Sequence, residues 1–243
     1  MNRYLRSSKA AQSGFTLVEI AIVLVIIGLL LGGILKGQEM ITQAKIKNLI
    51  GDMNGVSAAM NSYQDRYRAL PGDDKNAGTR WQNTTTPGNG DGVVNDAYLA
   101  VVPTTLANAA ATAALPESTF FWHHLRLAGF VSGTGADQPF NALSGKMGVQ
   151  TGDGAAVSGT ATAPGATLAS SGITDFGGLI LCSANLPDKV SISVDAQLDD
   201  GNGATGSVRA ALQNAPNMAI GNTTAATNYF ETGTNIYVLC RQM

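Results

Sequence analysis

One carboxylate lies inside the most apolar segment of this 243-residue chain. The segment runs from Phe15 to Leu35, which is long enough to cross the roughly 30 Å of a bilayer's hydrocarbon as a helix, and Glu19 is its one acidic residue. A carboxylate at the centre of a span costs about 2.5 to 3.5 kcal/mol, so such a residue usually has a specific partner. Glu19 therefore either pairs with a positive group or snorkels to the membrane surface from near the end of an ordinary anchor.

Three basic residues precede the apolar segment and predict its orientation. Arg3, Arg6 and Lys9 form a positive n-region, which places the N-terminus in the cytoplasm and the chain beyond the apolar segment on the other side of the membrane. No A-x-A-like cleavage site comes soon after the apolar segment. We therefore expect processing in front of the segment, so that the apolar helix stays in the mature protein.

The residues Gly14-Phe15-Thr16-Leu17-Val18-Glu19 resemble the class III signal of type IV prepilins and type II secretion pseudopilins. The resemblance implies that a prepilin peptidase removes the leader, residues 1–14, by cutting between Gly14 and Phe15, and methylates the amine of Phe15. In pilins the carboxylate matching Glu19 pairs with the terminal amine of a neighbouring subunit. The resemblance thus implies an assembly role for Glu19, Leu17 and Val18. Its implied partners are other pilin subunits and an inner-membrane assembly platform with a cytoplasmic ATPase.

A single long helix is expected after the signal. Its apolar residues recur at alternating steps of three and four, which draws one stripe along a helix: Ile46, Leu49, Met53, Val56, Met60, Tyr63 and Tyr67. The sequence Pro71-Gly72-Asp73-Asp74 predicts its end near residue 70. We expect a helix over about 15–69, with residues 15–35 in the membrane or filament core and 36–70 as the amphipathic half.

Residues 71–243 are expected to form one periplasmic or extracellular domain with long loops. Candidate strands cover 146–150, 179–183, 207–212 and 235–240, and a short helix lies within 120–131. The segment 186–198 fits a helix or a strand, and its pattern slightly favours a helix. The fold class is therefore α+β, and the resemblance implies a pilin-like fold in which the long helix packs on a small antiparallel sheet.

The two cysteines predict a disulfide. In an exported chain, an even pair such as Cys182 and Cys240 is typical of a bridge, whereas free thiols or a metal pair are the alternatives. Closing a loop of this size stabilises the fold by roughly 4 kcal/mol on the chain-entropy model. The bridge would also hold a C-terminus that otherwise frays.

One glycine-rich loop gathers oxygen ligands of the kind that calcium uses. Asn89, Asp91, Asn95 and Asp96 lie within it, but the full EF-hand spacing is missing. Turns of Asn or Asp followed by Gly produce the same residues without an ion. Calcium is thus a possible ligand, and we expect no other cofactor.

Charge and motifs argue against several function classes. Removal of the leader leaves 12 basic residues against 17 acidic ones, a net charge near −5, so general nucleic-acid binding is not expected. His123 and His124 are adjacent and diverge on a helix; we expect one to pack beside Trp122 and the other to meet solvent. No nucleophile-elbow, phosphate-loop or H-x-x-x-H pattern occurs, and we expect a protein that is not an enzyme.

Three functions fit the sequence. The first is a type IV pilus subunit, minor or specialised because of its length and loops, and used in adhesion, motility or DNA uptake. The second is a type II secretion pseudopilin whose filament helps to export folded proteins. The third is a membrane-anchored binding domain that never polymerises. Before assembly, each would be a single-pass protein of the inner membrane with its C-terminal domain in the periplasm.

Overall fold

The computed structural model describes residues 14–100, 102, 106, 117–152, 173, 176–218, 224–225 and 228–243. The basic residues of the leader, Arg3, Arg6 and Lys9, lie outside this part of the chain. Two compact units are present, one extending to Gln43 and the other covering Ala44–Met243. The boundary between them falls within the first helix.

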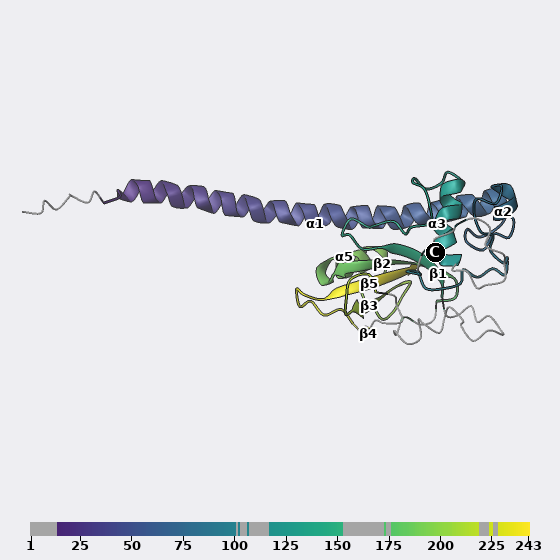
Figure 1. Cartoon of the computed structure of the whole chain (residues 1–243). Coiled ribbons are helices and arrows are strands. Elements are labelled where there is room, and N and C mark those ends of the chain that lie inside the picture. The colour runs from purple at the N-terminus through teal and green to yellow at the C-terminus, as the bar shows by residue number, and fades with distance from the viewer. Residues whose placement is uncertain are drawn as a thin grey trace, which may run out of the picture. The chain divides into compact units, whose positions relative to one another are not determined.

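The helix α1 covers Leu17–Tyr67, a length of 51 residues, and confirms the predicted long helix (Figure 1). It ends because Arg68 takes a positive φ of 55° while its amide still donates to the Gln64 carbonyl, 2.8 Å away. Pro71, three residues further on, has no amide to donate. In the first unit every described side chain up to Lys36 is exposed, and α1 is by length and composition able to span a membrane.

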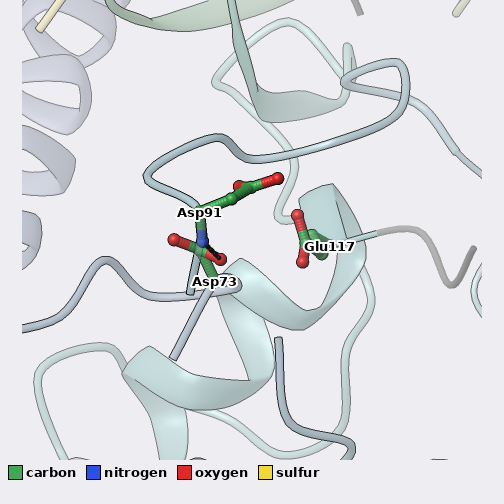
Figure 2. A group of neighbouring side chains, drawn as sticks. All are labelled: Asp73, Asp91 and Glu117. Atoms are coloured by element: carbon green, nitrogen blue, oxygen red, sulfur yellow. Dashed lines mark hydrogen bonds between the residues drawn. The ribbon is translucent and has the colours of Figure 1, made fainter. Parts of the chain in front are cut away.

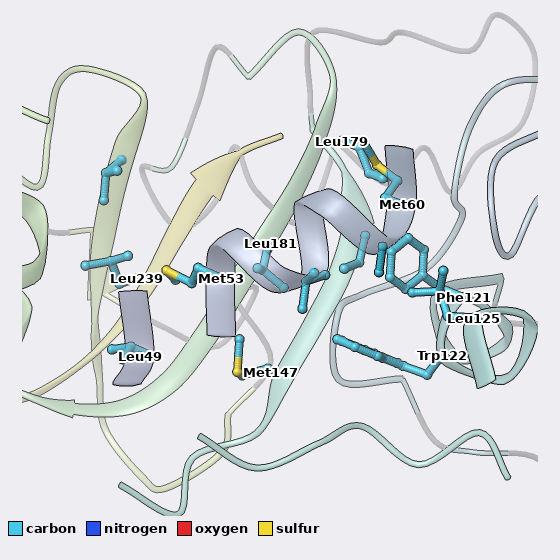
Figure 3. Close-up of a cluster of buried hydrophobic side chains, with 14 of the residues drawn as sticks. Leu49, Met53, Met60, Phe121, Trp122, Leu125, Met147, Leu179, Leu181 and Leu239 are labelled. Atoms are coloured by element: carbon cyan, nitrogen blue, oxygen red, sulfur yellow. The ribbon is translucent and has the colours of Figure 1, made fainter. Parts of the chain in front are cut away.

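In the second unit, the predicted apolar stripe of α1 is the face that packs on the domain. Six of its seven members are buried and Tyr67 is partly buried. Figure 3 shows Leu49, Met53 and Met60 of this stripe among side chains of the sheet and of α3. Because this core joins residues from every layer of the unit, it fixes the amphipathic half of α1 against the sheet.

The described strands form a five-stranded sheet in the order β1-β2-β5-β3-β4, in which all neighbours are antiparallel. The strands are β1 (Met147–Thr151), β2 (Leu179–Pro187), β3 (Val208–Gln213), β4 (Thr224–Ala225) and β5 (Ile236–Gln242). Four of them overlap the predicted strands, although β2 continues four residues beyond its predicted end, and the two-residue β4 was not predicted. A register shift between Ser183 and Leu186 accompanies Asn185, whose φ is 59°.

Among the residues that the structure describes, three short helices complete the second unit: α2 (Ala77–Arg80), α3 (Glu117–Leu127) and α5 (Asp188–Leu198). α3 begins three residues earlier and ends four residues earlier than the segment predicted for it, and Gly129 lies just beyond it at a φ of 79°. α5 confirms the helical interpretation for 188–198, since Val190 and Val194, one turn apart, are both buried in the core, whereas Leu186 and Pro187 belong to β2. The four-residue α2 lies in a breaker-rich stretch and was not predicted.

The disulfide between Cys182 and Cys240 is formed, as predicted. The two residues face each other across the paired strands β2 and β5. Their side chains belong to a second buried cluster on the opposite face of the sheet from α1, together with Tyr98, Ile180 and Phe176. β5 lies between β2 and β3, so the C-terminal strand is a central strand held by hydrogen bonds to both neighbours. The expectation that the bridge restrains a fraying C-terminus is therefore wrong, because the sheet already holds this strand.

Candidate functional site

The predicted cleavage position lies just in front of α1. Gly14, Phe15 and Thr16 are not helical, and the Phe15 side chain is 85% exposed. A peptidase must reach its scissile bond in an extended, accessible segment, so this local structure suits processing between Gly14 and Phe15. Leu17 and Val18 lie in the first helical turn and are also exposed, at 89% and 67%.

Glu19 has a partner within the chain. Its carboxylate accepts hydrogen bonds from the Thr16 amide at 2.7 Å and from the Thr16 hydroxyl at 2.8 Å, while the Thr16 hydroxyl accepts from the Glu19 amide at 3.3 Å. This reciprocal arrangement is a capping box at the start of α1. Thr16 was not predicted to take part, although Thr16-Leu17-Val18-Glu19 fits the T-x-x-E signature of such a box.

The second feature is a group of three carboxylates in the domain. Oxygen atoms of Asp73, Asp91 and Glu117 lie within 4.8 Å of one another (Figure 2). Asp73 lies after the end of α1, Asp91 lies in the predicted glycine-rich loop, and Glu117 is the first residue of α3. Three segments that are separate in sequence therefore converge on one point.

Backbone amides surround two of these carboxylates. Asp73 accepts hydrogen bonds from the amides of Gly90 at 2.6 Å and Gly92 at 2.8 Å. Glu117 accepts from the amides of Asn89 at 3.1 Å and Asn95 at 3.0 Å. The buried carboxylates therefore hold the loop over 89–95 in place by its own backbone.

Burial raises the pKa of Glu117 to about 7, although its hydrogen bonds to the amides of Asn95 and Asn89 act in the other direction. The nearby charges of Asp73 and Asp91 raise it further. Burial likewise raises the pKa of Asp73. Full ionisation of the three carboxylates is consequently unfavourable, and a bound cation would reduce this cost.

The oxygen groups predicted to hold calcium are only partly brought together. Asp91 belongs to the carboxylate group, and the side-chain amides of Asn89 and Asn95 donate to Asp91 and Glu117, each at 2.9 Å. Asp96 is not among the three carboxylates. Asp73 and Glu117 were missed because they are distant in the sequence, and calcium binding stays a prediction.

Neither of the two histidines is exposed to solvent, contrary to the expectation that one of them would be. His123 and His124 are both buried, as are all the other residues of α3 from Glu117 to Leu125. His124 accepts from the Gly72 amide at 2.9 Å through Nδ1 and donates to the Thr86 carbonyl at 3.1 Å through Nε2. Burial lowers the pKa of His124 to about 4, so the ring is neutral and serves as a structural tie between loops.

Residues 9–35 match the family model described as the prokaryotic N-terminal methylation motif. This is the class III signal of type IV pilins and pseudopilins, and it covers the predicted cleavage position and the apolar helix. Among curated proteins and among solved structures, nothing matches the chain significantly. The match thus supports a pilin-like or pseudopilin-like subunit that is processed at its N-terminus and anchored by an apolar helix.

Proposed function

We propose that the chain is a structural subunit of a type IV pilus-like filament, of the minor or specialised kind. The observation that carries the proposal is the methylation motif over residues 9–35, which includes the apolar start of α1, where the described residues are all exposed up to Lys36. Exposed apolar surface of this extent requires lipid or neighbouring protein to cover it. In a subunit that passes from the membrane into a filament, lipid covers this surface first and neighbouring subunits cover it afterwards.

Processing between Gly14 and Phe15 would create the group that Glu19 needs. The new amine of Phe15 would adjoin Thr16, whose amide and hydroxyl already engage the Glu19 carboxylate. In the filament, the Glu19 carboxylate would pair with the methylated amine of a neighbouring subunit, and Leu17 and Val18 would pack beside this pair. An ion pair buried in an apolar environment strongly fixes the relative position of its two partners.

The partners follow from this role: a prepilin peptidase, other pilin subunits, and an inner-membrane platform driven by a cytoplasmic ATPase. The subunit would begin with its N-terminus in the cytoplasm and its domain in the periplasm. The disulfide between Cys182 and Cys240 supports export, because such bridges persist in oxidising compartments.

A pseudopilin of type II secretion is the alternative, since the motif is common to both classes. A non-polymerising membrane-anchored domain is the further alternative. The test is Glu19→Ala, with Glu39→Ala as a control on the same helix, because Glu39 pairs with Lys36 at the exposed surface. We expect Glu19→Ala to abolish filament assembly while leaving membrane insertion and peptidase cleavage intact, and Glu39→Ala to assemble normally.

Three readouts separate the functions. Surface filaments that contain this chain and disappear in Glu19→Ala support the pilus subunit. Loss of secretion of folded proteins without loss of surface filaments would favour the pseudopilin. If the two variants behave alike in assembly and in secretion, the chain is an anchor and the filament proposal is wrong.

A further inference from the structure

A hollow of about 540 Å³ lies in the second unit where α1 ends. Its wall comes from the last turn of α1, the segment directly after it, and the loop around Gly90 and Gly92. The wall carries two cationic side chains, Arg68 and Lys75, beside the aromatic ring of Tyr67. This volume is within the range of pockets that hold small organic ligands.

The acidic side chains at the wall are already engaged. Asp73 accepts hydrogen bonds from three backbone amides of the 90–92 loop. Asp74 accepts from the Tyr63 hydroxyl at 2.8 Å and from the Asn76 amide at 2.9 Å, and it forms an ion pair with Arg80. Both carboxylates line the hollow, and both are already paired with donors of the protein.

The cationic and neutral polar side chains at the wall have no partner among the described residues. Within the part of the chain that the structure describes, the side chains of Arg68 and Lys75 make no hydrogen bond or ion pair. The same holds there for the Tyr67 hydroxyl and for the side-chain amides of Gln64 and Asn76. The stem of Lys75 lies against Gly90, where an added Cβ would be 3.2 Å from Lys75 Cδ. The residues that line the hollow thus include two cations, two amides and a phenol.

We propose that this hollow binds an acidic saccharide. Arg68 and Lys75 would hold the carboxylate of the sugar, because a guanidinium and an ammonium are the strongest protein donors to that group. The amides of Gln64 and Asn76 and the Tyr67 hydroxyl would serve the ring hydroxyls, since each is able to donate and to accept. The volume accommodates one or two sugar rings, so the site recognises a short acidic unit of a surface polysaccharide.

A nucleic acid fits the same charges less well. The Tyr67 ring already contacts the guanidinium of Arg80 at 4.2 Å, that of Arg66 at 5.3 Å, and the rings of Tyr63 and Trp81. Bases that bind single-stranded sites stack on open aromatic faces, and here the ring is largely occupied.

The test is calorimetric titration of the full chain, in micelles of a detergent without a sugar headgroup, at low ionic strength. The probes are digalacturonate and sialyllactose, with neutral lactose as the matched sugar and a short oligothymidylate as the polyphosphate. The variants are Arg68→Gln with Lys75→Gln, and the control is Lys47→Gln, an exposed lysine of α1 that is not part of the wall. Tryptophan fluorescence checks that each variant is folded.

We expect an acidic sugar to bind with a Kd of about 1 mM or tighter, lactose to bind at least about tenfold more weakly, and the double variant to lose at least about tenfold in affinity. Lys47→Gln should bind as the unaltered chain does. Absence of binding by both acidic sugars, or equal binding by the double variant and the control, would overturn the proposal. Tighter binding of oligothymidylate than of either sugar would overturn the ligand class. None of these outcomes depends on filament assembly.

Discussion

Two buried titrating groups of the domain should shift its stability with pH in opposite directions, and single substitutions should separate them. Glu117 has a folded pKa raised to about 7, so its contribution to stability is fully present below its unfolded pKa and is lost as the pH rises through 7. His124 has a folded pKa lowered to about 4, so its contribution is present above its unfolded pKa and is lost as the pH falls through 4. Between pH 4.5 and 6.5 the two contributions oppose each other.

The magnitude follows from the size of the shifts. The ordinary pKa is 4.5 for a carboxyl such as Glu117 and 6.5 for an imidazole such as His124. Each shift is thus between two and three pKa units, and since one unit corresponds to about 1.4 kcal/mol, each group contributes about 3 kcal/mol across its window. The free energy of unfolding of Glu117→Gln, minus that of the unaltered chain, should therefore rise by about 3 kcal/mol from pH 4.5 to 7. For His124→Gln the corresponding difference should fall by about 3 kcal/mol from pH 4 to 6.5.

Urea denaturation monitored by tryptophan fluorescence measures these differences, because Trp81 and Trp122 both lie in the second unit. A chelator keeps cations away from Glu117. The other carboxyl groups are the same in all the chains, so their contributions to the free energy of unfolding cancel when differences between variants are taken. If the Glu117→Gln difference is constant with pH, Glu117 does not titrate with a raised pKa, and the account of a buried, partly protonated carboxylate group is wrong.

Three further predictions concern stability. Leu49→Ala, which removes a fully buried side chain of the α1 stripe, should destabilise the domain by about 2 to 5 kcal/mol, whereas Gly51→Ala on the exposed face should stabilise it by about 0.5 to 1 kcal/mol; equal effects in urea denaturation would contradict the packing of this face. Cys182→Ser with Cys240→Ser should cost about 2 to 5 kcal/mol, and reductant should lower the melting temperature of the unaltered chain but not that of the variant. Calcium should raise the melting temperature of the unaltered chain and not of Asp91→Asn; no rise in either chain would remove calcium as a ligand.

Much of the fold was predictable because its signals are local. The alternating steps from Ile46 to Tyr67 define the buried face of α1 whatever it packs against, and the four main strands are short apolar runs between turn residues. The sequence fitted either a helix or a strand at α5, and the spacing of Val190 and Val194, which lie one turn apart on the buried face, favoured the helix. β4 and α2 were not predicted, because two-residue and four-residue elements have no period to detect.

The sequence by itself determined the processing motif, since Gly14 to Glu19 are contiguous and lie within the residues that match the N-terminal methylation motif. It also predicted a bridge between Cys182 and Cys240, because these are the two cysteines of the chain, and the structure contains that bridge. Only the tertiary structure decided that the bridge joins central strands, that Asp73 and Glu117 join Asp91, and that Arg68 and Lys75 share one hollow. These groupings depend on where loops meet after the core has packed, and no local sequence pattern contains that information.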